Sequence, residues 1–148
     1  MDECLEIIRG VMSGDYFEFH GEFYDFDAVK INPVPTQSVP VIIGGHAKPA
    51  LRRAARIGDG WMSANSDFDT LKSLVEQINA FRAEYGTQSK AFEFHCLDSA
   101  ASKPDHFKRL ADIGATHACV TPWNPYDPSV DSAFKVDAIR RFADSFVR

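Results

Sequence analysis

The sequence lacks the features that mark several large classes of protein. No apolar run among its 148 residues approaches the roughly 18 residues needed to cross a bilayer, so no membrane span is expected. The formal net charge is −5, which argues against a nucleic-acid partner because such proteins carry a basic patch or stripe. The acidic opening Met1-Asp2-Glu3 predicts that no secretory signal peptide is present.

Cysteine is scarce, and recognisable metal-binding spacings are lacking. The three cysteines (Cys4, Cys96 and Cys119) are odd in number and far apart, so neither a disulfide framework nor a CxxC site is predicted. We interpret them as reduced thiols of a cytoplasmic protein. The five histidines are His20, His46, His95, His106 and His117. None stands in an HExxH or comparable ligand spacing, so no metal site is predicted.

Core-forming residues are abundant. Hydrophobic residues make up 45% of the chain, and the 12 phenylalanines, 4 tyrosines and 2 tryptophans exclude an intrinsically disordered protein. The length is that of one domain with a substantial core, so residues 1–148 are expected to form a single domain.

The N-terminal third predicts a small substructure of its own. Apolar residues recur at helical spacing from Asp2 to Gly14. Aromatic residues then alternate between Tyr16 and Phe26 about Gly21-Glu22, which predicts a β-hairpin. The segment Asn32 to Pro40 contains three prolines and is expected to be an extended connector.

From Val39 onward, strand and helix patterns alternate. The expected strands are 39–43, 61–64, 91–97 and 117–120, and the expected helices are 48–57, from 67 or 69 to 85, 104–113 and 133–146. Such alternation with apolar strands predicts a parallel α/β sheet with right-handed crossovers. Periodicity does not distinguish an open doubly wound sheet from part of a barrel.

The turn after the first of these strands is a candidate binding site. Gly44 and Gly45 let the backbone approach a ligand closely, and the helix from Lys48 turns its N-terminal N–H groups to the same place. A phosphate group suits this position, although a Gly-Gly turn can also be only a tight connection. One of the arginines Arg52, Arg53 and Arg56 could clamp that phosphate or lie on a solvated helix face.

Five motifs in order resemble the bacterial luciferase-like monooxygenase family. They are Phe19-His20-Gly21-Glu22-Phe23-Tyr24, Pro33-Val34-Pro35-Thr36-Gln37, Val41-Ile42-Ile43-Gly44-Gly45, Arg53-Ala54-Ala55-Arg56 and Gly58-Asp59-Gly60-Trp61. The resemblance covers nearly the whole chain and is strongest over residues 14–64. It is closest to the branch that uses flavin mononucleotide (FMN) or the deazaflavin coenzyme F420.

This resemblance implies a cofactor site at the C-terminal mouth of a (β/α)₈ barrel. Carried over to this chain, Gly44, Gly45 and His46 would bind the cofactor phosphate, and Gly60 and Trp61 would shape the pocket. Relatives often carry a small hydroxyl residue at the position of His46, so this side chain departs from the pattern. Trp61 could equally be a plain core residue.

The chain is shorter than such a barrel. A complete barrel needs roughly 250 residues, so the 148 residues resemble the C-terminal half of one, preceded by a small helix and hairpin. Half a barrel exposes two strand edges, near Val41 and Val120, and an open lumen face. We therefore expect a homo-oligomer, or pairing with a missing N-terminal half.

The implied function is that of a flavin- or deazaflavin-dependent oxidoreductase or monooxygenase acting on a small organic molecule. The alternative is a non-catalytic flavin- or phosphate-binding module, or an inactive truncated relative. No catalytic residue is assigned, because in flavin chemistry the cofactor carries the reaction. Glu93 and His95 are expected to face the lumen, opposite Phe92, Phe94 and Cys96. The loop from Thr121 to Tyr126 follows the fourth strand, at the functional end of such a sheet.

Overall fold

A computed structural model describes residues 1–98 and 104–146. The chain divides into two compact units, Met1–Pro40 and Val41–Arg148, and each is described by itself. That residues 1–148 act as one domain stays a prediction.

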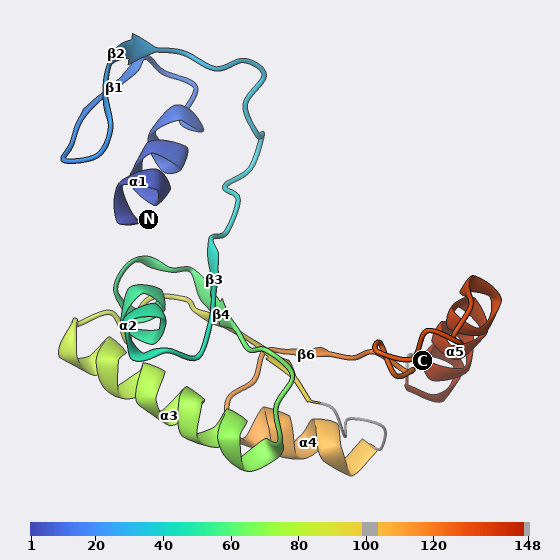
Figure 1. Ribbon diagram of the computed structural model, residues 1–148. Coiled ribbons are helices and arrows are strands. Elements are labelled where there is room, and N and C mark those ends of the chain that lie inside the picture. The colour runs from blue at the N-terminus through green and yellow to red at the C-terminus, as the bar shows by residue number, and fades with distance from the viewer. Residues whose placement is uncertain (99–103, 147–148) are drawn as a thin grey trace. The chain divides into compact units, whose positions relative to one another are not determined.

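The first unit contains a helix and a hairpin. Helix α1 (Asp2–Val11) precedes strands β1 (Phe17–His20) and β2 (Asp25–Val29), which pair antiparallel (Figure 1). The hairpin turn is held by α1, because the Glu3 carboxylate accepts backbone N–H bonds from residues 22, 23 and 24 at 2.9, 3.0 and 3.1 Å. The helix and hairpin predicted from the sequence are therefore confirmed.

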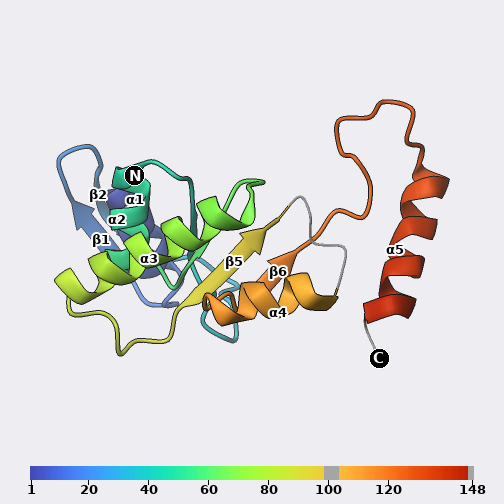
Figure 2. The ribbon, with the colours of Figure 1, turned by 90° about the horizontal axis from the view of Figure 1, so that it is seen from below.

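The second unit contains a parallel sheet. Its strands are β3 (Ile42–Gly44), β4 (Gly60–Met62), β5 (Glu93–Leu97) and β6 (His117–Cys119), and within the described residues they are hydrogen-bonded in that order. Its helices are α2 (Lys48–Ile57), α3 (Phe68–Glu84), α4 (Pro104–Asp112) and α5 (Ser132–Phe146). Helices α3 and α4 lie on the same side of the sheet, and β5 is seen between them (Figure 2).

The strand order decides between the two architectures that the sequence left open. A doubly wound sheet reverses its strand order at a switch point, whereas neighbours in a barrel follow one another along the chain. The order β3-β4-β5-β6 is sequential. The described sheet therefore has the topology of one arc of a barrel, and β3 and β6 lie at its edges, as predicted.

The core lies between the sheet and its helices. Trp61, Phe94 and Cys96 are buried on the helix side of the strands. Leu51 of α2 and Leu71 and Ile78 of α3 are buried as well. Along β5 the buried residues alternate with the partly exposed Glu93, His95 and Leu97. This alternation confirms that Glu93 and His95 face away from the helix-facing side chains.

Local sequence signals explain the helix boundaries. The Asp67 carboxylate caps α3 by accepting the N–H of Thr70 at 2.8 Å. Pro49 occupies the first turn of α2, where a missing N–H costs little. Within the described part of the chain, no helix combines the length and the apolar character that a membrane crossing requires.

Candidate functional site

The turn after β3 has the backbone conformation that its glycines predict. Gly45 has a φ angle of +111°, a conformation that other residues rarely adopt, and a Cβ there would lie 3.2 Å from the Cβ of Ala50. Gly44 has ordinary backbone angles, and a Cβ there would meet nothing within 4 Å. Gly45 is thus required by the turn itself, whereas Gly44 leaves open space beside the backbone.

Trp61 anchors this turn from the core. Its side chain is fully buried, and the indole Nε1–H donates a hydrogen bond to the carbonyl oxygen of Gly45 at 2.8 Å. Of the two interpretations of Trp61, a core residue or a wall of the pocket, its burial favours the core residue. Its contribution to a binding site is to fix the position of the Gly45 peptide.

His46 connects the turn to the next strand. Its Nε2 accepts a hydrogen bond from the backbone N–H of Ala64, just after β4, at 2.9 Å. A nitrogen that accepts from an N–H carries no proton, so the imidazole is the neutral tautomer with its proton on Nδ1. The ring centroid lies 5.9 Å from that of Trp61. His46 therefore presents an Nδ1–H donor at the carboxyl end of β3.

Gly60 is not brought to this turn. It begins β4 and pairs with Ile42, whereas Gly44 pairs with Met62, two residues or about 7 Å farther along the strands. A Cβ at Gly60 would lie 2.6 Å from the carbonyl oxygen of Glu93. The glycine is explained by close packing of neighbouring strands at their amino ends, and its contribution to the shape of the cofactor pocket stays a prediction.

Arg52 is not available as a phosphate clamp. Its guanidinium Nη1 donates to Glu84 and to the Tyr85 hydroxyl, each at 2.8 Å, and the group lies 4.5 Å from the ring centroid of Phe81. Bonding to Glu84 and then to Tyr85 raises the pKa of Arg52 above its ordinary value. The side chain fastens α2 to α3.

A pocket of about 620 Å³ lies at the carboxyl ends of the strands. Its lining includes Asn65 after β4, Asp98 after β5, and the loop from Thr121 to Tyr126 after β6. Helix α5 closes another side with Arg141, Phe142 and Phe146 among others. The prediction that the Thr121–Tyr126 loop lies at the functional end of the sheet is consistent with this position.

One buried carboxylate reaches this pocket. The side chain of Asp98 is 1% exposed, and its Oδ2 lies 2.5 Å from Nε2 of His106 on α4. Sequence reasoning did not single out Asp98. The available signal was its position directly after a strand, where side chains of a parallel α/β sheet reach a binding site.

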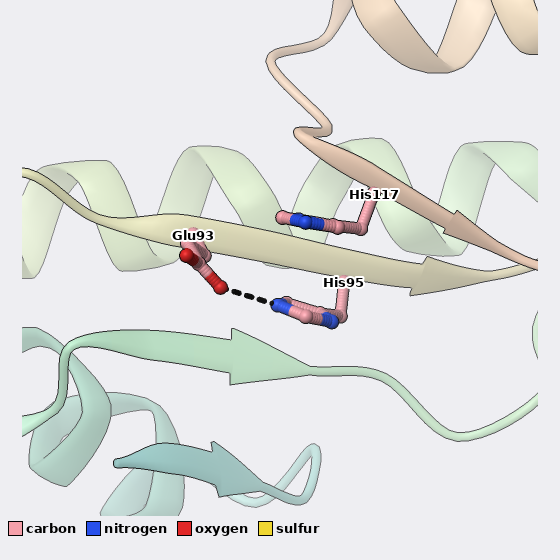
Figure 3. Close-up of side chains that lie close together, drawn as sticks. All are labelled: Glu93, His95 and His117. Carbon is pink, nitrogen blue, oxygen red and sulfur yellow. Dashed lines mark hydrogen bonds and ion pairs between the residues drawn. The ribbon is translucent and has the colours of Figure 1, made fainter. Parts of the chain in front are cut away.

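A second polar cluster lies on the sheet face opposite the helices. It consists of Glu93 and His95 from β5 and His117 from β6 (Figure 3). His95 Nε2 lies 2.8 Å from the Glu93 carboxylate, and the two imidazole rings stack 4.1 Å apart at 10°. The sequence predicted the pair Glu93 and His95 but missed His117, because strand register is needed to place it opposite His95.

Comparison with known proteins assigns the family. The family model described as luciferase-like monooxygenase matches residues 1–131. The chain belongs to this family. The resemblance stated from the five sequence motifs is thereby confirmed.

The relatives differ in how much of them the chain covers. An uncharacterized protein of Mycobacterium tuberculosis is 43% identical over 150 residues, which cover 99% of this chain and 51% of the relative. An FMNH₂-dependent dimethylsulfone monooxygenase of Pseudomonas fluorescens is 32% identical over 79 residues, 53% of this chain and 22% of that protein. The chain thus spans about half the length of its mycobacterial relative.

A solved structure shows the same fold. The structure of an F420-dependent secondary alcohol dehydrogenase with an F420-acetone adduct matches with a TM-score of 0.58 and 21% identity, covering 93% of this chain and 42% of that chain. The α/β unit with its parallel sheet is therefore part of a (β/α)₈ barrel. The fold prediction is confirmed.

Proposed function

We propose that this chain contributes the phosphate-binding part of a flavin- or F420-dependent oxidoreductase that acts on a small organic molecule. Membership of the luciferase-like family supports the reaction class. The similar proteins include one named as FMNH₂-dependent and one named as F420-dependent, which leaves both cofactors as candidates.

The observation that carries the proposal is the turn formed by Gly44, Gly45 and His46. Gly44 is open on the side where a Cβ would stand. In the first turn of α2, Pro49 has no N–H and the Ala50 N–H donates to the Ala47 carbonyl oxygen at 2.8 Å, so the helix offers a ligand the N–H of Lys48. His46 adds an Nδ1–H donor, as its bond from Ala64 requires. A helix N–H and an imidazole N–H therefore flank the open position at Gly44, which suits a phosphate.

The pocket at the carboxyl ends of the strands is the candidate site for the ring of the cofactor. The pocket after β4, β5 and β6 combines the aromatic side chains Trp123 and Tyr126 with polar groups, as flat-ring binding sites do. A bound reduced flavin or deazaflavin supplies hydride transfer or oxygen activation. The chain's own residues hold the phosphate, keep the turn rigid through Trp61, and border the ring.

The phosphate assignment is tested by comparing two ligands that differ only in the phosphate. FMN and riboflavin are titrated against the chain while flavin fluorescence is recorded. Hydrogen bonds to a charged group contribute about 1.5–3 kcal/mol, so FMN should bind at least about tenfold more tightly than riboflavin. Equal affinities would overturn the assignment.

A matched pair of variants localises the effect. Gly44→Val places a side chain in the open position without backbone strain and should remove the preference for FMN. Ala118→Val adds the same side chain to edge strand β6 and should keep the preference. If Gly44→Val retains it, the phosphate binds elsewhere.

A second candidate function is a non-catalytic flavin-binding module. It is favoured by one observation, that the chain spans about half of its mycobacterial relative. Turnover separates the two functions. If the flavin-loaded chain consumes a reductant, the result supports an enzyme. If it binds flavin but turns over none of the substrates tested, the result supports a non-catalytic module.

A further inference from the structure

We propose that Glu93, His95 and His117 form a binding site for a divalent cation of the zinc class, built from residues other than those of the phosphate-binding turn. The three residues each offer one ligand atom, and these atoms lie within 4.8 Å of one another. Two imidazoles and one carboxylate are a common ligand set of zinc sites, and imidazole disfavours calcium and magnesium.

The backbone fixes which side chains meet. Glu93 and His95 are two residues apart on β5 and therefore point to the same face. His95 and His117 are direct partners in the parallel register of β5 and β6. All three ligands thus come from paired strands, which hold a metal site more accurately than loops do.

The hydrogen bonds of His117 prepare it as a ligand. The Thr116 hydroxyl lies 2.9 Å from His117 Nδ1 and 3.2 Å from the carbonyl oxygen of Phe94. When the hydroxyl donates to the carbonyl it accepts from His117 Nδ1–H, and this tautomer has its lone pair on Nε2, as a metal ligand requires. Such a bond at the second nitrogen orients metal-bound histidines.

Small side-chain movements complete the site. Ligand atoms around a tetrahedral zinc ion lie about 3.4 Å apart when bonds are 2.0–2.1 Å long. The His95 and Glu93 ligand atoms, 2.8 Å apart, must therefore separate slightly, and the stacked imidazole rings must tilt so that His117 approaches them. His117 is exposed and Glu93 is 41% exposed, so both side chains have room to turn. The ion replaces the proton between His95 Nε2 and Glu93 Oε2, and that proton passes to solvent.

The strand register places the cluster within the sheet. Glu93 is level with Gly60 at the amino ends of the strands, whereas His95 and His117 are level with Met62, the last residue of β4. The pocket begins beyond the carboxyl ends of β4, β5 and β6, with Asn65, Asp98 and Thr121 in its lining. An ion held by both strands would fasten edge strand β6 to β5, and its remaining coordination position would face away from the helices.

The test is a metal titration of the full chain after treatment with a chelator. Zinc affinity is measured by competition with a chromophoric chelator, and cobalt is used as a spectroscopic probe. We expect one zinc ion per chain and a cobalt spectrum of a four-coordinate site without a near-ultraviolet thiolate band. No binding, or a thiolate band from a cysteine, would overturn the proposal.

Two variants assign the ligands. His117→Asn should weaken zinc binding by at least about tenfold, since losing even an outer partner of a ligand costs 10–100-fold. His20→Asn is the matched control, because His20 also pairs with a carboxylate, Asp25, at 2.5 Å but belongs to the hairpin. Circular dichroism verifies that both variants fold. If His117→Asn binds zinc as tightly as the parent, or if both variants lose zinc affinity equally, the proposed site is refuted.

Discussion

The indole Nε1–H of Trp61 and the carbonyl oxygen of Gly45 are 2.8 Å apart, and this bond joins the hydrophobic core to the turn after β3. Trp61 is fully buried, so its orientation is set by packing. The Gly45 peptide is consequently held in one position before any ligand arrives. A binding site built on this turn is therefore rigid because the core beneath it is rigid.

Removing the indole donor should loosen the turn. Trp61→Phe leaves the Gly45 carbonyl without this partner and leaves a small cavity, so we expect a loss of at least about 1–2 kcal/mol in the free energy of unfolding. Trp123→Phe, in the loop that lines the pocket, should change stability by less than about 0.5 kcal/mol. Urea denaturation followed by circular dichroism measures both. Equal stability of the two variants would mean that Trp61 does not anchor the turn.

The two glycines of the turn should respond differently to alanine. Gly45→Ala forces a side chain onto a backbone with φ of +111° and should cost roughly 1–2 kcal/mol in the free energy of unfolding. Gly44→Ala meets open space and should stay within about 0.5 kcal/mol of the parent. Thermal unfolding of the two variants checks the order, and a more damaging Gly44→Ala would contradict it.

Burial of a thiol predicts a loss of stability at high pH. Desolvation, with smaller effects of Cys119 and Asp98, raises the pKa of Cys96 to about 11 from an ordinary value of 9.0. Between pH 9 and 11 the unfolded chain releases a proton that the folded chain keeps, so the free energy of unfolding should fall as pH rises. Below pH 9 the contribution is complete.

This pH effect is isolated by comparison with Cys96→Ala. Urea denaturation at several pH values between 8 and 11 gives the slope of stability against pH for each protein. Tyrosines and lysines are present in both proteins, so their contributions to the slope cancel in the comparison. The stability of the parent should therefore fall more steeply with pH than that of Cys96→Ala. Parallel slopes would show that the Cys96 thiol does not differ in pKa between the folded and unfolded states.

The open sheet predicts self-association. Strands β3 and β6 are the edges of the described sheet, and each edge carries unpaired N–H and C=O groups. We expect the isolated chain to form a dimer or higher oligomer that covers the face bearing His95 and the edges. Sedimentation equilibrium at micromolar concentration measures this, and a stable 16.5 kDa monomer would contradict the expectation.

Local sequence signals predicted the helices well. The helix from Lys48 to Ile57 has the predicted bounds, and α3 begins after the Asp67 cap as the sequence indicated. The strands are shorter than predicted: β3 covers Ile42–Gly44, and Val39 to Val41 lie before it. Strand ends depend on which neighbours are available for pairing, and a single sequence does not contain that information.

Contacts between neighbouring strands account for the two features of the site that the sequence did not predict. His117 joins Glu93 and His95 only through the register of two strands more than twenty residues apart. Gly60 was predicted to help shape the cofactor pocket, and the sequence did not indicate that its small size also allows the close approach of the Glu93 carbonyl oxygen. In both cases the decisive contact is between strands, where sequence spacing carries no signal.

The phosphorus-31 resonance of FMN tests the central claim most directly, because it reports on the phosphate alone. Titrating the chain into FMN should shift and broaden this resonance, and Gly44→Val should abolish the change while Ala118→Val preserves it. A phosphate resonance that is unaffected by saturating chain, or that responds equally to all three proteins, would contradict a phosphate site at Gly44 and Gly45.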